Sequence, residues 1–298
     1  REGAFALKGV RCSRDDFVLP NSGGLPLHAS LYYQGQRVED AKGKSAVIYC
    51  HGNCGCRLDA NDVTRLLLPE DICVCCLDFS GSGVSGGEFI TLGAREPGDL
   101  KFIVTFLRTI GIVQVGLWGR SMGAVTCLRY LHTEKDLSIA GIVADSPFTT
   151  LPDLMREIAK TQLPRLLLPL TGPVLRVIEG RVAKKAHFSL REVDSTVSAQ
   201  ECWVPALFCH GQSDSLIPST HSDQIVAAYA GDCRLVRVKG DHNDLRPLHF
   251  QQAARLFFKG VLRGGIKTPE QLFAGVKEQD DRHEDDDDDD TASSSSSE

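Results

Sequence analysis

A serine motif of the G-x-S-x-G type lies near the middle of the chain, at Gly119-Arg120-Ser121-Met122-Gly123. A serine flanked by glycines in this way can sit on a sharp turn that exposes its hydroxyl group. The motif follows an apolar run typical of a strand and precedes a segment with helical spacing, which is the context that such a turn requires. The motif therefore predicts Ser121 as the nucleophile of a serine hydrolase.

A serine hydroxyl group needs a base to accept its proton and an acid to orient that base. Asp214 follows one expected strand and His242 follows the next, so the order is serine, aspartate, histidine. Active sites of open α/β sheets assemble at the carboxyl ends of strands, so we expect Ser121, Asp214 and His242 to form a triad. Asp145 also ends an expected strand and is the alternative acid. Three other histidines are weaker candidates for the base by position: His210, His221 and His249.

The tetrahedral intermediate of acyl transfer needs two backbone N–H donors. One is expected from Met122, directly after the nucleophile, and the other from Asn53, in the loop after the first parallel strand. His51 in that loop is expected to make a structural hydrogen bond beneath the oxyanion hole.

A second glycine-rich stretch, residues 81–86, matches G-x-G-x-x-G. It follows the second strand–helix unit, whereas a dinucleotide site would lie in the first. We therefore interpret it as a structural turn after Asp78, and we expect no cofactor.

The pattern of apolar residues predicts an α/β fold with a mainly parallel sheet. Residues 17–20 and 27–33 alternate in the manner of an antiparallel hairpin around Gly23-Gly24. Short apolar runs typical of buried parallel strands follow at residues 46–50, 72–77, 113–118, 139–144, 205–209 and 234–238. Segments with helical spacing separate most of them, at residues 100–107, 125–131 and 222–230.

The alternation lapses between Phe148 and Val204, over more than fifty residues rich in leucine and proline. A structureless loop of this length is unusual, so two to four helices forming a cap are expected, with a long crossover packed on the sheet as the alternative. The expected division is a core in two parts (1–149 and 204–277), a helical cap insertion (150–203) and a disordered tail (278–298).

The net charge of −6 is unevenly distributed. Residues 278–298 contain eleven acidic residues and one arginine, so this tail carries −10 and the rest of the chain +4. The rest of the chain is nearly neutral and its lysines and arginines are scattered, so its charge does not indicate nucleic-acid binding. The tail combines an aspartate run with five serines, and we expect it to be disordered and to be a segment for a protein partner or an acidophilic kinase.

Eleven cysteines, several of them inside apolar runs, fit reduced and buried thiols in a cytoplasmic compartment. Cys50, Cys54 and Cys56 lie near His51, but no second pair occurs at zinc-finger spacing, so no metal is expected. No apolar run approaches the length of a transmembrane helix. Because the chain begins with Arg1 rather than Met, we expect that residues precede it.

Taken together, these motifs resemble the α/β-hydrolase superfamily in its serine aminopeptidase S33-like (Hydrolase-4) branch, and within it a set of plant and protist hydrolases. The resemblance covers nearly all of residues 5–263. It is carried by five segments, at residues 49–57, 77–83, 117–125, 145–148 and 240–243. It implies the triad and the oxyanion donors named above, but it does not identify the substrate. Arg120 inside the serine motif and the aspartate-serine tail are not general features of the superfamily.

The sequence thus predicts a serine hydrolase that cleaves a small acyl ester or thioester through an acyl-enzyme intermediate. The leucine-rich residues 163–174 are expected to line an apolar acyl pocket in the cap. An aminopeptidase or oligopeptidase is the alternative, and it would need an acidic anchor for a free amino group. A catalytically silent binding protein is the alternative from a different class.

Overall fold

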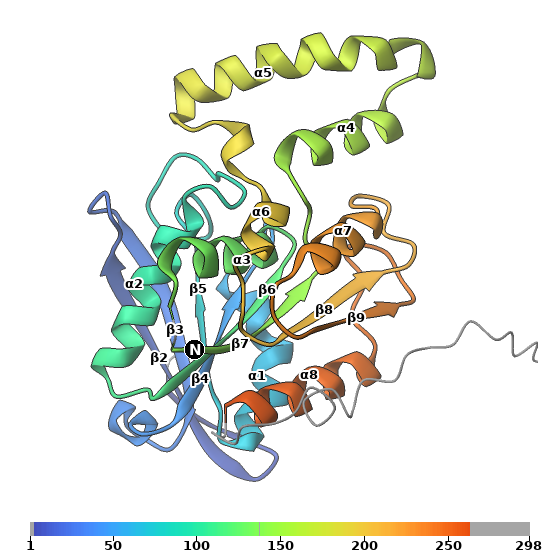
Figure 1. Ribbon diagram of the computed structural model, residues 1–298. Helices are drawn as coiled ribbons and strands as arrows, with labels where there is room; N and C mark the ends of the chain where they lie inside the picture. Colours follow the sequence, from blue (N-terminus) through green and yellow to red (C-terminus); the bar gives the residue numbers. More distant parts are fainter. Residues whose placement is uncertain (1–2, 137, 263–298) are drawn as a thin grey trace, which may run out of the picture.

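The computed structural model describes residues 3–136 and 138–262, which form one nine-stranded sheet with helices on both faces (Figure 1). The strand order is β1-β2-β3-β5-β4-β6-β7-β8-β9. The pairs β1–β2, β2–β3 and β3–β5 are antiparallel. All other neighbouring pairs, which involve β5, β4, β6, β7, β8 and β9, are parallel. The strands are β1 Gly3–Leu7, β2 Val10–Pro20, β3 Pro26–Gln34, β4 Ser45–Cys50, β5 Cys73–Leu77, β6 Gln114–Arg120, β7 Ile139–Asp145, β8 Ala206–Gly211 and β9 Cys233–Val238.

The helices divide between the two faces of the sheet (Figure 1). Helices α2, α3, α6 and α7 cover one face, and α1 and α8 cover the other. The α-helices are α1 Asn61–Leu67, α2 Glu96–Thr109, α3 Met122–Glu134, α4 Leu151–Gln162, α5 Thr171–Ala186, α6 Ser195–Ala199, α7 Thr220–Ala228 and α8 Leu248–Val261. Short 3-10 helices are η1 Val38–Ala41, η2 Arg57–Ala60, η3 Leu68–Glu70, η4 Arg165–Leu170 and η5 Leu190–Glu192.

The continuous apolar runs in the sequence arise because the parallel strands are buried on both faces. Neighbouring residues of one strand enter opposite core clusters. Ile48 packs in the cluster under α2 and α3, whereas Val47 packs in the cluster under α1 and α8. Leu117 and Trp118 of β6 divide in the same way.

The expected fold class is confirmed. The six parallel strands lie where the apolar runs predict them, and β2 and β3 form the antiparallel hairpin. The structure adds β1, α1 and α8, which the sequence analysis did not identify.

The segment between β7 and β8 contains α4, η4, α5, η5 and α6. Helices α4 and α5 form a hairpin that projects from the sheet, with α5 on the far side of α4 (Figure 1). Its base is held by a buried apolar cluster that includes Phe148, Leu151 and Phe188. Helix α6 returns to the body and contacts α3 and α7. The division into core and cap units stays a prediction.

The leucine-rich stretch of the cap corrects one expectation. We expected these residues to line an apolar acyl pocket, but Leu166 is 87% exposed, and Leu170 and Val174 are both more than half exposed. An apolar run in a sequence does not reveal which of its residues have a neighbour to pack against, and here the outer side of the hairpin has none within the described chain.

The thiols are mostly interior. All eleven cysteines are free, and eight of them are buried. Burial raises the pKa of several of these thiols, to about 12 for Cys73 and Cys202.

Residues 278–298, expected to form an acidic tail for a protein partner or a kinase, lie outside the described residues. Within residues 3–136 and 138–262, no helix is both long and apolar enough to cross a bilayer.

Candidate active site

Ser121 lies on a strained turn between β6 and α3. Its backbone angles are φ 51° and ψ −117°, a conformation that residues other than glycine rarely adopt. Its N–H group donates a hydrogen bond to the carbonyl oxygen of Asp145 on the neighbouring strand, at 2.7 Å. The turn therefore fixes Ser121 at the carboxyl end of β6, directly before the first residue of α3.

The two glycines of the serine motif are required by close backbone approach. A Cβ atom on Gly123 would lie 1.9 Å from the carbonyl oxygen of Cys50, at the end of β4. A Cβ atom on Gly119 would lie 2.3 Å from the carbonyl oxygen of Gly123. Any side chain at either position would push α3 away from the sheet and displace Ser121.

The structure brings Asp214 and His242 together, as the sequence predicts. His242 Nδ1 lies 2.7 Å from Asp214 Oδ2, and both side chains are buried. A carboxylate can only accept, so Nδ1 carries the proton in this contact. The lone pair of a neutral His242 is then on Nε2, which leaves that atom able to accept a proton.

The carboxylate of Asp214 has two further hydrogen-bond donors and a neighbouring histidine. Oδ1 accepts from the N–H groups of Leu216 and Ile217, and the Nε2 atom of His210 lies 3.3 Å from Oδ2. Burial opposes ionisation of this carboxyl group, but the contacts with His210 and His242 outweigh it, so the pKa of Asp214 falls well below its usual range. Asp214 is thus held as an anion.

Asp145, the alternative acid, has a different partner. Both of its carboxylate oxygens accept from Arg246 Nε at 2.9 Å, and the two side chains are almost completely buried. Arg246 also donates to Ser146 Oγ and to the carbonyl oxygen of Asp241. The Asp145 carboxylate therefore balances a buried guanidinium group.

Arg120, the unusual residue of the serine motif, joins the nucleophile turn to the histidine loop. Its Nη2 atom donates to the carbonyl oxygens of His242, at 2.5 Å, and Asp244, at 3.0 Å. Its Nε atom lies 3.9 Å from Asp145. Arg120 and Arg246 together hold the loop of His242 beside β6 and β7, a role that neither spacing nor composition could reveal.

The loop that contains Asn53 lies beside the nucleophile. A Cβ atom on Gly52 would be 3.6 Å from Ser121 Cβ, and Asn53 itself is exposed. His51 is buried, and its Nε2 atom accepts from the N–H group of Phe79 at 3.2 Å. Its Nδ1 atom must then donate to the carbonyl oxygen of Gly52, at 2.7 Å. Burial lowers the pKa of His51, so it is a neutral structural residue, as expected.

The three weaker base candidates differ from His242 in their hydrogen-bond partners or in their exposure. His210 is buried between the carbonyl oxygen of Ile217 and Ser222 Oγ. His221 Nδ1 accepts from the N–H group of Thr149. His249 is exposed on α8.

The glycine-rich stretch after β5 closes around the Asp78 carboxylate. Arg57 and the N–H group of Val84 donate to it. A Cβ atom on Gly83 would lie 2.3 Å from the same carboxylate, which leaves no room for a side chain.

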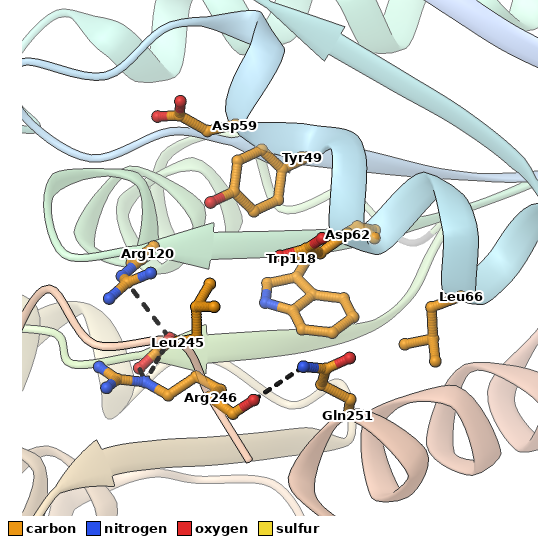
Figure 2. Close-up of a pocket in the computed structure, with 11 residues that line it drawn as sticks. Tyr49, Asp59, Asp62, Leu66, Trp118, Arg120, Leu245, Arg246 and Gln251 are labelled. Atoms are coloured by element: carbon orange, nitrogen blue, oxygen red, sulfur yellow. Dashed lines mark hydrogen bonds and ion pairs between the residues drawn. The ribbon is translucent and has the colours of Figure 1, made fainter. Parts of the chain in front are cut away.

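Neither of two cavities in the described chain is lined by Ser121, and only the smaller one borders the site, through Arg120, Asp145 and Arg246. The smaller, of about 70 Å³, is lined by Arg120 and Arg246 together with Tyr49 and Trp118 (Figure 2). It has room for a few water molecules rather than an acyl chain. The larger, of about 610 Å³, lies between the β2–β3 turn and the start of α2. In the described part of the chain, no three metal-ligating side chains lie together.

A model of the alpha/beta hydrolase fold family matches residues 45–200, slightly more than half of the chain, and includes the loop of Asn53 and the turn of Ser121. The chain belongs to the alpha/beta hydrolase fold family. Relatives in sequence include Uncharacterized protein YqkD of Bacillus subtilis (strain 168), 26% identical over 231 residues, which are 76% of this chain and 72% of the relative. Uncharacterized protein Rv2307c of Mycobacterium tuberculosis is 27% identical over 201 residues, 67% of this chain and 63% of the relative, so the chain spans less than two thirds of that protein.

Solved structures of esterases share this alpha/beta hydrolase fold. The Pyrococcus furiosus esterase Pf2001 has a TM-score of 0.65 and 22% identity, covering 84% of this chain and 93% of that one. Acetyl xylan esterase from Paenibacillus sp. R4 has a TM-score of 0.67 and 16% identity, covering 88% of each chain. At this level of identity the likeness establishes the fold alone.

Proposed function

We propose that this protein is a serine hydrolase that cleaves a small acyl ester or thioester through an acyl-enzyme intermediate. The observation that carries the proposal is the strained turn that holds Ser121 at the sheet edge where Asp214 and His242 are hydrogen bonded. The proposed roles are nucleophile for Ser121, base for His242 and orienting acid for Asp214, with Asn53 and Met122 as oxyanion donors. The reaction needs no cofactor.

In the first half of the reaction, Ser121 Oγ attacks the acyl carbonyl carbon while His242 Nε2 takes the hydroxyl proton. The carbonyl oxygen becomes an anion that the N–H groups of Asn53 and Met122 stabilise. The bond to the leaving alcohol or thiol then breaks, and His242 returns the proton to it. The charge on Asp214 stabilises the imidazolium form of His242 during this exchange.

In the second half, His242 takes a proton from water, and the resulting oxygen nucleophile attacks the acyl-Ser121 carbonyl carbon. Collapse of this second tetrahedral intermediate breaks the bond to Ser121 Oγ, which regains its proton from His242. The products are a carboxylic acid and the free enzyme.

Two considerations favour an ester or thioester over a peptide. Esterases are among the solved structures with this fold. An aminopeptidase would need a free carboxylate to bind the substrate amino group, and each acid of the cap already has a partner. Glu157 pairs with Lys160, Glu179 with Arg191, Asp153 with Arg156 and Glu201 with Lys135, while Glu192 and Asp194 accept from backbone N–H groups at helix starts. On its motifs, we place the chain in the serine aminopeptidase S33-like (Hydrolase-4) branch without assigning it peptidase activity.

The test is labelling with a fluorophosphonate probe, wild type beside Ser121→Ala, followed by a panel of p-nitrophenyl acyl esters and aminoacyl amides. We expect the wild type to be labelled and to hydrolyse the esters, and the variant to do neither. Equal labelling of both proteins would exclude Ser121 as the nucleophile. Absence of labelling and turnover in a folded wild type would favour a catalytically silent binding protein, and turnover of the amides alone would favour the aminopeptidase alternative.

A further inference from the structure

The outer surface of the cap carries a concentration of exposed apolar side chains. Of the eighteen large apolar side chains that are exposed in the described chain, six lie within residues 163–177. The most exposed is Leu166, at 87%. The six are Leu163, Leu166, Leu167, Leu170, Val174 and Val177. Single exposed apolar residues are common on protein surfaces, but a contiguous group marks an interaction surface.

Helix α5 presents this surface on one side only. Val174, Val177, Arg181 and Lys184 are spaced by three, four and three residues, so they share one side of the helix, and all are exposed. Leu175, Ile178 and Val182, on the other side, are half-buried. Figure 1 shows that α5 is the outermost element of the α4–α5 hairpin, so its outer side faces away from the body.

Cations accompany the apolar residues. Arg176, Arg181, Lys184 and Lys185 are all exposed, and within the described chain none of the four pairs with an acid. The one acid on α5 is Glu179, which is paired with Arg191. We call the four cations together with Leu166, Leu167, Leu170, Val174 and Val177 the cap face.

We propose that the cap face docks onto an anionic lipid surface. Leucines at the tip of the hairpin would enter the boundary between headgroups and acyl chains, and the cations of α5 would attract anionic headgroups. A second copy of the chain is a poorer occupant, because two such faces would bring eight unpaired cations together. The projection of the hairpin lets it meet a planar surface without a clash from the sheet. Docking does not use the chemistry of Ser121, so this proposal and the proposed function fail separately.

The experiment is co-sedimentation of the full chain with phosphatidylcholine vesicles, with and without phosphatidylserine. We expect binding to the vesicles that contain phosphatidylserine, weakened by added salt and unchanged in Ser121→Ala. Leu166→Ser with Leu170→Ser should weaken binding about tenfold or more for each leucine that inserts. The matched control is Leu248→Ser, an exposed leucine on α8, which should bind as the wild type does.

A second pair of variants tests the charge. Lys184→Gln with Lys185→Gln should weaken binding to the anionic vesicles about fivefold for each cation. Lys8→Gln with Lys42→Gln removes the same charge from exposed positions outside the cap and should have little effect. Because all these residues are exposed, the variants should fold, which thermal unfolding checks.

Three outcomes would overturn the proposal. The first is a wild type that stays off both kinds of vesicle, or that binds no better than the double leucine variant. The second is self-association in light scattering that the leucine variant abolishes, which would assign the face to a second copy. The third is carbodiimide cross-linking of Lys184 or Lys185 to residues 285–290 without vesicle binding, which would assign it to the acidic segment of this chain.

Discussion

The carboxyl edge of the sheet and the α4–α5 hairpin are built in opposite ways. At the sheet edge, Asp214, Asp145 and Arg246 are buried, and each has hydrogen-bond partners. On the cap face of the hairpin, leucines are exposed and the four cations of α5 have no acidic partner in the described chain. The difference indicates that the first region is organised around internal geometry and the second around something outside the chain. Substitutions at the sheet edge should therefore change turnover or stability, and substitutions on the cap face should change neither.

The largest effect is expected from Asp214→Asn. An amide at this position can donate to His242 Nδ1 and so stabilise the wrong tautomer, and we expect kcat to fall by about 10⁴-fold with the fold retained. The measurement is ester hydrolysis beside circular dichroism. A fall of less than about tenfold would show that Asp214 does not orient the base.

The same substitution at Asp145 should affect stability instead. Asp145→Asn leaves the buried guanidinium group of Arg246 without a counter-charge, which should lower the free energy of unfolding by about 3 kcal/mol. Urea denaturation measures this. If Asp145→Asn abolished turnover in a protein of unchanged stability, Asp145 would be the acid and the assignment of Asp214 would be wrong.

Asp99, on α2, is a buried carboxyl group away from the proposed triad, and its ionisation should make stability depend on pH. Burial raises the pKa of Asp99 to about 6, although hydrogen bonds from Ser80 oppose the shift. Folding therefore favours the protonated form, so its contribution to stability is complete below pH about 4 and lost as the pH rises through about 6. The loss amounts to at most about 3 kcal/mol.

Asp99→Asn should remove this pH dependence, because the amide resembles the protonated acid. As the pH rises from about 4 to above about 6, the free energy of unfolding of the variant should increase relative to that of the wild type. Urea denaturation of both proteins at each end of this range measures the difference. A constant difference between the two proteins would show that Asp99 ionises normally in the folded state.

Arg120 should have a smaller, purely kinetic effect. Arg120→Ala removes the hydrogen bonds to the carbonyl oxygens of His242 and Asp244, so the histidine loop should shift relative to Ser121. We expect kcat to fall about tenfold to a hundredfold with KM nearly unchanged. Arg108→Ala removes an exposed arginine at the far end of α2 and is the control. A rise in KM alone would indicate that Arg120 contacts substrate instead.

The smallest effect is expected on the hairpin. Leu166→Ser with Leu170→Ser should leave hydrolysis of a small, water-soluble ester within about twofold of the wild type, because surface changes rarely disturb a distant site. A large loss of activity in solution would mean that these leucines belong to the substrate site, and the contrast between the two regions would disappear.

The parallel strands could be predicted because burial on both faces leaves a continuous apolar run, as in residues 46–50 and 205–209. The turn of Ser121 could be predicted because close backbone approach requires glycines, which a sequence displays directly. The contact between Asp214 and His242 could be anticipated from their places after neighbouring strands.

Other features depend on contacts that no local pattern encodes. Arg246 meets Asp145 across 101 residues of sequence, so nothing near either residue indicated the pair. Residues 163–174 have the composition of a buried segment, but four of their five leucines are exposed on a hairpin that projects from the sheet.

The eight buried thiols can report local unfolding of this protein. Thiolates are the reactive form, and a buried thiol with a raised pKa is protected from alkylation until the chain around it opens. Four different strands each contain one of the buried cysteines Cys12, Cys50, Cys75 and Cys209. The exposed Cys54 gives the alkylation rate of an unprotected thiol. Alkylation followed by mass spectrometry would thus rank the strands by the free energy of local unfolding, with no reporter group added to the chain.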